Sequence, residues 1–74
     1  MAEVSASLLY NIGMCFFNSS SWKQAEVYFN ETIMINANHI KALHRRALAR
    51  YHLQKYEEAM NDIKQAFHKD RRNA

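Results

Sequence analysis

A run of cationic side chains between residues 41 and 52 is the part of this sequence best suited to bind a ligand. The run reads as one helix, in which about 100° per residue places four side chains on one face: Lys41, Arg45, Leu48 and His52. Lys41 and Arg45 are one turn apart, a spacing at which like charges destabilise an isolated helix by about 0.2–0.5 kcal/mol. The pair therefore suits an anionic ligand, and the alternative is a solvated basic face without one.

The composition indicates one small helical domain. The chain has 74 residues, of which 49% are hydrophobic, with one glycine and no proline. Because strand-and-turn folds need such residues at their turns, their scarcity favours helices joined by short polar turns. The net charge of +3 gives a mild preference for acidic partners and does not by itself indicate nucleic acid. Neither a signal-peptide pattern nor an apolar run of transmembrane length is present, so we expect a cytoplasmic protein with no membrane partner.

Hydrophobic periodicity predicts four helices, at about residues 6–18, 22–35, 40–53 and 56–69, and a polar tail at 70–74 too short to pack. Gly13 inside the first helix should allow a neighbouring helix to approach closely. We expect a capping box from Ser21 to Gln24 to open the second helix, and Asn38 to cap the third. The side chains expected to face inward from the fourth helix are Ala59, Met60, Ile63, Ala66 and Phe67.

The sequence contains no recognisable catalytic arrangement. It has no Ser/His/Asp set, no paired buried carboxylates and no phosphate-cradling glycine loop, so we expect no enzymatic activity and no cofactor. The single cysteine, Cys15, cannot form an internal disulfide, and its apolar neighbours predict a packed, inert thiol. The histidines lack the mutual spacing of metal ligands, so no metal site is predicted at His39, His44, His52 or His68.

The two halves of the chain match at one fixed offset. Gly13 and Ala47 are 34 residues apart, as are Ala25 and Ala59, and a 34-residue period of helix-turn-helix units is typical of the tetratricopeptide repeat. The chain resembles two such repeats, residues 6–39 and 40–73, on the following positions: Leu9, Gly13, Phe16, Trp22, Ala25 and Phe29, then Leu43, Ala47, Tyr51, Tyr56 and Ala59. The resemblance implies an all-α fold, with residues 1–74 forming a single domain of two tandem tetratricopeptide repeats, a fragment of a right-handed α-solenoid.

Arg46 and Arg50 depart from the repeat, because they stand where many repeats have packing residues. We expect their stems to cover the outer helix while their charged ends reach water. About three units and a polar cap are usually needed for a stable stack. We therefore expect a fragment of a longer protein, or a chain that self-associates through its open repeat ends, for example as a dimer that exchanges helices.

In the tetratricopeptide fold the first helix of each repeat lines a concave groove. The offset brings two sets of side chains together there: Ser7, Asn11, Met14 and Asn18 with Lys41, Arg45, Leu48 and His52. An amide, two cations and apolar neighbours suit the carboxylate end of a peptide, because charge-assisted hydrogen bonds hold the anion.

A narrower resemblance concerns Asn11 within Leu-Tyr-Asn-Ile-Gly, and Lys41, His44 and Arg45 within Lys-Ala-Leu-His-Arg-Arg-Ala. These segments resemble the carboxylate clamp of co-chaperone tetratricopeptide domains, which occur in immunophilin-type prolyl isomerases and related adaptors. Such domains bind the C-terminal Glu-Glu-Val-Asp tails of cytosolic heat-shock chaperones. The resemblance implies that this chain corresponds to the second and third repeats of such a domain, in a parent protein whose prolyl isomerase domain would lie elsewhere.

Two other functions remain open at this point. Nucleic-acid binding is the less favoured, because acidic residues are also numerous and no known binding motif accompanies the cations, which are Lys41, Arg45, Arg46, Arg50, Arg71 and Arg72. The other is a structural or self-association module whose groove binds nothing.

Overall fold

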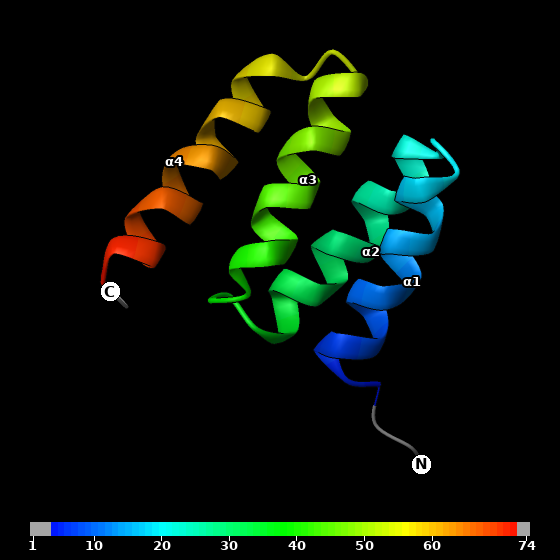
Figure 1. Cartoon of the computed structure of the whole chain (residues 1–74), viewed down its shortest axis with the longest axis horizontal. Helices are drawn as coiled ribbons and strands as arrows, with labels where there is room; N and C mark the ends of the chain where they lie inside the picture. Colours follow the sequence, from blue (N-terminus) through cyan, green and yellow to red (C-terminus); the bar gives the residue numbers. More distant parts are fainter. Residues whose placement is uncertain (1–3, 73–74) are drawn as a thin grey trace.

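The computed structural model describes residues 4–72, which form four helices and no strand (Figure 1). These are α1 (Ala6–Asn18), α2 (Trp22–Ile35), α3 (Ile40–His52) and α4 (Tyr56–Arg72). Each helix packs against the next one along the chain, so α1 and α4 lie at opposite ends of the molecule (Figure 1). The predicted all-α fold of two tandem helical hairpins is therefore confirmed.

The predicted ends of the first three helices agree with the structure to within one residue, but α4 is longer than predicted. It continues through residue 72, so the expectation of an unpacked tail is wrong for residues 70–72, and residues 73 and 74 lie outside the described part. No proline or glycine stops the helix there, and Lys69 Nζ in its last turns donates to Asn38 Oδ1 at 3.0 Å. Within residues 4–72, none of the helices has the length and apolar character needed to cross a membrane.

The turns inside the two hairpins repeat each other 34 residues apart. Ser20 and Gln54 occupy the same position in the repeat, and both have positive φ, at 60° and 65°. The N–H of the next residue, Ser21 or Lys55, bonds to the carbonyl five residues back, at 2.9 and 2.8 Å. This pairing satisfies carbonyls at the helix end, and its recurrence extends the sequence repeat to the backbone.

Two of the predicted helix caps are wrong. The Ser21 side chain makes no capping hydrogen bond, so the expected capping box is absent at the start of α2. The N-cap of α3 is His39, whose Nδ1 accepts from the N–H of Ala42 at 3.1 Å, rather than Asn38. The chain turns just before this point, where Asn36 accepts from the N–H of Asn38 at 3.1 Å through its side chain, and this turn moves the cap one residue later.

The first hairpin closes tightly around Gly13, as predicted. A Cβ at that position would lie 2.7 Å from Cε1 of Phe29, whose side chain is fully buried. Phe29 also packs with Ala25 and Ala49, which joins α2 to α3. The absence of a side chain at residue 13 is therefore what allows the ring of Phe29 to lie against α1.

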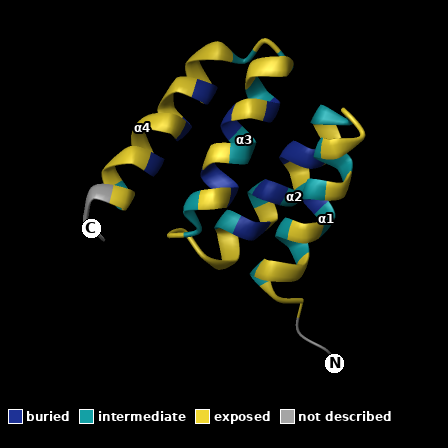
Figure 2. Cartoon of the chain, in the orientation of Figure 1, coloured by how far each residue is buried: buried dark blue, intermediate teal, exposed yellow. Residues whose placement is uncertain are grey.

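The second hairpin is more open than predicted (Figure 2). Ala59 and Ala66 are buried as expected, but Met60, Ile63 and Phe67 are 56%, 42% and 61% exposed, so the expectation that these three face inward is wrong. The reason is that α4 packs chiefly against α3, and only its small side chains and one acidic residue are enclosed there. An apolar face of α4 is consequently left at the surface.

Candidate functional site

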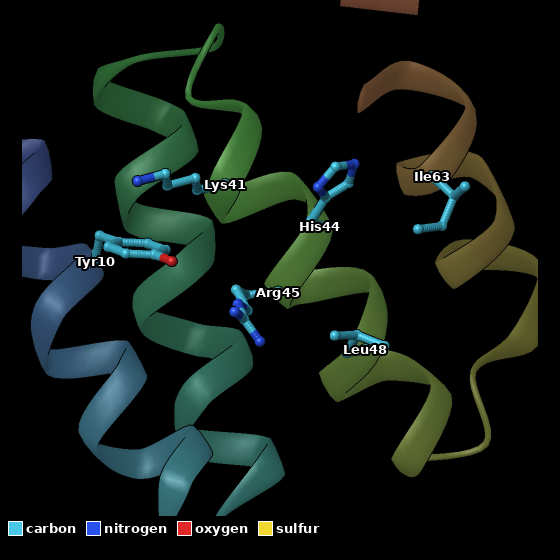
Figure 3. A pocket seen from close by; sticks show the side chains of 6 residues that line it. All are labelled: Tyr10, Lys41, His44, Arg45, Leu48 and Ile63. Atoms are coloured by element: carbon cyan, nitrogen blue, oxygen red, sulfur yellow. The ribbon is translucent and has the colours of Figure 1, made fainter. Parts of the chain in front are cut away.

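An open pocket of about 560 Å³ lies on the side of α3 that carries the cationic run (Figure 3). Residues from three helices line it: Tyr10 from α1; Lys41, His44, Arg45 and Leu48 from α3; and Ile63 from α4. All four α3 residues were predicted to belong to the site, whereas Tyr10 and Ile63 were not. The repeat contained a signal for Tyr10, because it is 34 residues before His44.

The two cations of this pocket have no carboxylate partner. Within residues 4–72, neither Lys41 nor Arg45 takes part in an ion pair. Arg45 is half-buried, and its Cζ lies 5.4 Å from the centroid of the Phe17 ring, where a cation–π contact holds the guanidinium. Two positive groups beside Leu48 can therefore accept an anion that carries an apolar side chain.

The predicted residues of α1 do not join this pocket. Ser7, Asn11 and Asn18 are exposed on α1, and none of them lines it. Met14 is partly buried and packs against the hydrophobic core, away from solvent. The helix contributes Tyr10 instead, and Asn11 directly follows it in the chain. The exposed amide of Asn11 is thus one residue from the lining.

His52 takes part in the contact between the two hairpins. Its ring stacks on Trp22, with centroids 3.9 Å apart and an interplanar angle of 5°. One face of the imidazole is therefore covered by the indole, and only the remaining faces and edges can meet a ligand.

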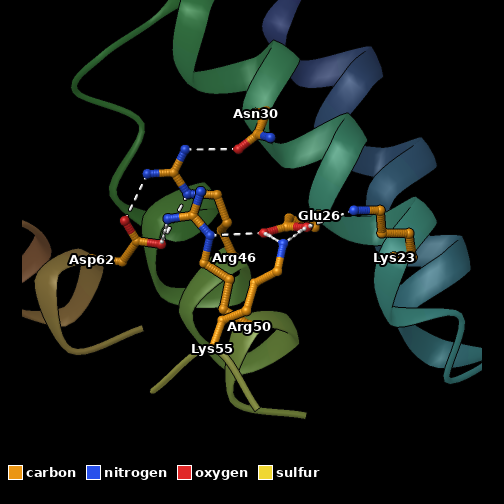
Figure 4. A network of polar contacts seen from close by, with 7 residues as sticks. All are labelled: Lys23, Glu26, Asn30, Arg46, Arg50, Lys55 and Asp62. Atoms are coloured by element: carbon orange, nitrogen blue, oxygen red, sulfur yellow. Dashed lines mark hydrogen bonds and ion pairs between the residues drawn. The ribbon is translucent and has the colours of Figure 1, made fainter. Parts of the chain in front are cut away.

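Arg46 and Arg50 lie on a different side of α3 and bond to carboxylates (Figure 4). Arg46 donates to both oxygens of Asp62, at 2.9 and 2.6 Å, and to Asn30 Oδ1 at 2.8 Å. Arg50 donates to Asp62 Oδ2 at 2.9 Å and to Glu26 Oε2 at 2.9 Å. The expectation that their charged ends reach water is wrong, because the side chains are only 14% and 16% exposed.

Glu26 completes this network from α2. It is 4% exposed and also accepts from Lys55 Nζ at 3.1 Å. Burial by itself would raise the pKa of Glu26, but the hydrogen bonds and charges of Arg50 and Lys55 outweigh it and hold the pKa below its ordinary value. Glu26 is therefore ionised at neutral pH and joins α2 to both α3 and the start of α4.

The four cations of α3 thus divide into two pairs. Arg46 and Arg50 hold helices together, and in the described chain every buried side-chain nitrogen or oxygen has a hydrogen-bond partner. Lys41 and Arg45 face the open pocket without an acidic neighbour. One pair is structural, and the other is available to a ligand.

Two further points concern reactive groups and relatives. The thiol of Cys15 is exposed, so the prediction of a packed thiol is wrong. The apolar neighbours of Cys15 in the sequence point to other sides of α1, since adjacent residues are about 100° apart. Across residues 4–72, no group of three or more His, Cys, Asp or Glu side chains is placed to hold a metal ion. No model of a known protein family matches the chain.

Proposed function

We propose that this chain is a tetratricopeptide-type interaction module that holds the acidic C-terminal end of a partner peptide in the pocket of Lys41 and Arg45. One observation carries the proposal: these two cations face an open pocket and form no ion pair within residues 4–72, whereas Arg46 and Arg50 of the same helix are bonded to carboxylates. Charge-assisted hydrogen bonds from two such cations are the usual means of holding a terminal carboxylate.

The repeat supports the family part of the proposal. The 34-residue period recurs in the positive-φ turns at Ser20 and Gln54. It recurs again in the packing of Gly13 against Phe29, whose equivalents in the second hairpin are Ala47 and Ile63. A helical hairpin repeated at this spacing is the unit of the tetratricopeptide stack.

The chemistry of the pocket supports a peptide that ends in acidic and apolar residues. Lys41 and Arg45 would hold carboxylates, while Leu48 and Ile63 would contact an apolar side chain. The proposed partner is accordingly a tail of the Glu-Glu-Val-Asp type, as found on cytosolic heat-shock chaperones, and the proposed setting is a cytoplasmic co-chaperone. Asn11, exposed one residue from Tyr10, would supply an amide to the same ligand.

The ion network weighs against nucleic acid as the partner. A phosphate backbone would need several cations along α3, yet Arg46 and Arg50 are engaged with Asp62. The two that remain, Lys41 and Arg45, fit one small anionic group better than an extended polyanion.

The test is a titration with a peptide ending in Glu-Glu-Val-Asp, with its C-terminus either free or amidated. We expect the free carboxylate to bind more tightly, and Arg45→Ala to weaken binding by about 1.5–3 kcal/mol, the range for hydrogen bonds to charged groups. Added salt should also weaken binding, since the pocket is open to water.

Lys64→Ala is the matched control, because it removes one positive charge from an exposed site on α4 outside the pocket. It should leave the affinity close to that of the wild type. Equal affinity for the free and amidated peptides, or equal losses in the Arg45 and Lys64 variants, would remove this pocket from the function.

A further inference from the structure

A second, apolar groove of about 350 Å³ lies between α3 and α4. Its lining consists of Ala47, Leu48, Tyr51, Tyr56, Ala59, Met60 and Ile63. Several of these side chains are largely at the surface, including Tyr51 at 58% and Met60 at 56% exposure. The groove is therefore an apolar surface that nothing within residues 4–72 covers.

The first hairpin shows what covers the equivalent surface. Thirty-four residues earlier, the groove positions are Gly13, Met14, Phe17, Trp22, Ala25, Glu26 and Phe29. In the structure α3 lies on this surface: Arg45 over Phe17, and His52 on Trp22. The occupant at this junction is thus the first helix of the following hairpin.

The other end of the molecule carries a helix of the same kind. α1 is the repeat equivalent of α3, and its outer face is open. Leu8 is 50% exposed and Cys15 is exposed, whereas their equivalents in α3, Ala42 and Ala49, are fully buried. The side of α1 that corresponds to the docked side of α3 is therefore available.

The two open surfaces also match in chemistry. At the junction inside the chain, Glu26 bonds to Arg50 at 2.9 Å. At a junction between copies, the corresponding residues are Met60 on the groove and Phe16 on α1. An acid and a base are thus replaced together by two apolar residues, so neither surface would bury an unpaired charge against the other.

We infer that a second copy of this chain docks head to tail, with the outer face of its α1 in the groove between α3 and α4. This contact joins two different surfaces, so copies can add in succession, and the oligomer grows with concentration. Each copy has a net charge of +3, so added salt should strengthen association, whereas it should weaken binding of an acidic peptide. The inference does not depend on the proposed peptide function, and the opposite salt responses separate the two.

Sedimentation velocity over a wide range of concentrations, under reducing conditions, tests the contact. We expect the sedimentation coefficient of the wild type to rise with concentration, and Met60→Glu to remain monomeric. Met34→Glu is the matched control, because Met34 is 82% exposed on α2 and lies outside both surfaces. It should behave like the wild type. A wild type that stays monomeric throughout, or a Met60 variant that associates equally well, would overturn the inference.

Cross-linking tests the register of the contact. Ala25 and Ala49 pack together in the core, so residue 59 of one copy should meet Cys15 of the next. Under a mild oxidant we expect Ala59→Cys to form a ladder of disulfide-linked oligomers, with peptide mapping showing bonds between positions 15 and 59. The wild type, with one cysteine per chain, can form only dimers. A variant linked only through its two Cys15 residues would contradict the register.

Discussion

Stacked rings close the first hairpin at the position where an ion pair closes the second. Phe16 and Tyr28 stack between α1 and α2, with centroids 5.5 Å apart and an interplanar angle of 16°. Thirty-four residues later, the corresponding residues are Arg50 and Asp62, joined by a hydrogen-bonded ion pair of 2.9 Å between α3 and α4. Around both pairs the turns and helix limits are equivalent.

The difference shows that one backbone arrangement can enclose two kinds of chemistry. The aromatic pair is stabilised by apolar burial and ring geometry, which depend little on pH. The ion pair is stable only while both partners are present and charged, because an isolated buried charge is costly. The second hairpin and its junction with α2 should therefore be the part of the molecule most sensitive to loss of one partner and to acid.

The largest effect is expected at Asp62. Asp62→Ala leaves Arg46 and Arg50 buried without their carboxylate and should lower the free energy of unfolding by about 3–5 kcal/mol. Tyr28→Ala, the equivalent change in the first hairpin, removes a partly buried ring and should cost about 1–3 kcal/mol. Urea denaturation followed by circular dichroism measures both.

If Asp62→Ala does not fold, Asp62→Asn provides the same comparison, since it keeps an oxygen acceptor and removes only the charge. An Asp62 variant no less stable than the Tyr28 variant would show that the ion pair contributes no more than the ring stack.

A smaller effect is expected at Gly13, which faces Phe29 where the second hairpin has Ala47 and Ile63. Gly13→Ala gains about 1 kcal/mol of helix propensity, but its Cβ would lie 2.7 Å from a buried ring, so we expect a net loss of about 1–2 kcal/mol in unfolding experiments. Adding Phe29→Ile reproduces the pair of the second hairpin and removes the close contact.

The double variant should therefore lose less than the two single changes together. Ala47→Gly is the reverse change in the second hairpin, where the facing Ile63 is 42% exposed, and it should cost only the helix propensity of about 1 kcal/mol. Strict additivity of Gly13→Ala and Phe29→Ile would contradict the steric account.

The smallest effect is the acid response of Glu26, whose pKa is held below its ordinary value by Arg50 and Lys55 despite burial. A depressed pKa in the folded state stabilises the protein above the unfolded value of about 4.3, and this contribution is lost as pH falls through the folded pKa. We expect the urea midpoint to fall between pH 7 and pH 4, and less steeply in Glu26→Gln. Glu31→Gln, an exposed change on the same helix, should keep the wild-type response. An unchanged slope in the Glu26 variant would exclude this linkage.

Local patterns predicted the elements and the repeat. The 34-residue offset between Gly13 and Ala47 anticipated two equivalent hairpins, and the missing side chain at Gly13 anticipated a close helix contact. The caps were less predictable, because the turn at Asn36 decides which of two neighbouring residues begins α3. The inward side of α4 was predicted wrongly, since periodicity identifies an apolar face such as that of Met60 but not what lies against it.

The sequence by itself determined where the helices lie, how the two hairpins correspond and that α3 carries a cluster of cations, because these depend on residue types and on spacing along one chain. Only the tertiary structure decided the role of each cation. Arg46 and Arg50 are structural because Asp62 and Glu26 reach them from other helices, 16 and 24 residues away in the sequence. Lys41 and Arg45 have no such carboxylate within residues 4–72 and face the pocket. Which charges meet depends on how α2 and α4 pack on α3, and no spacing within α3 contains that information.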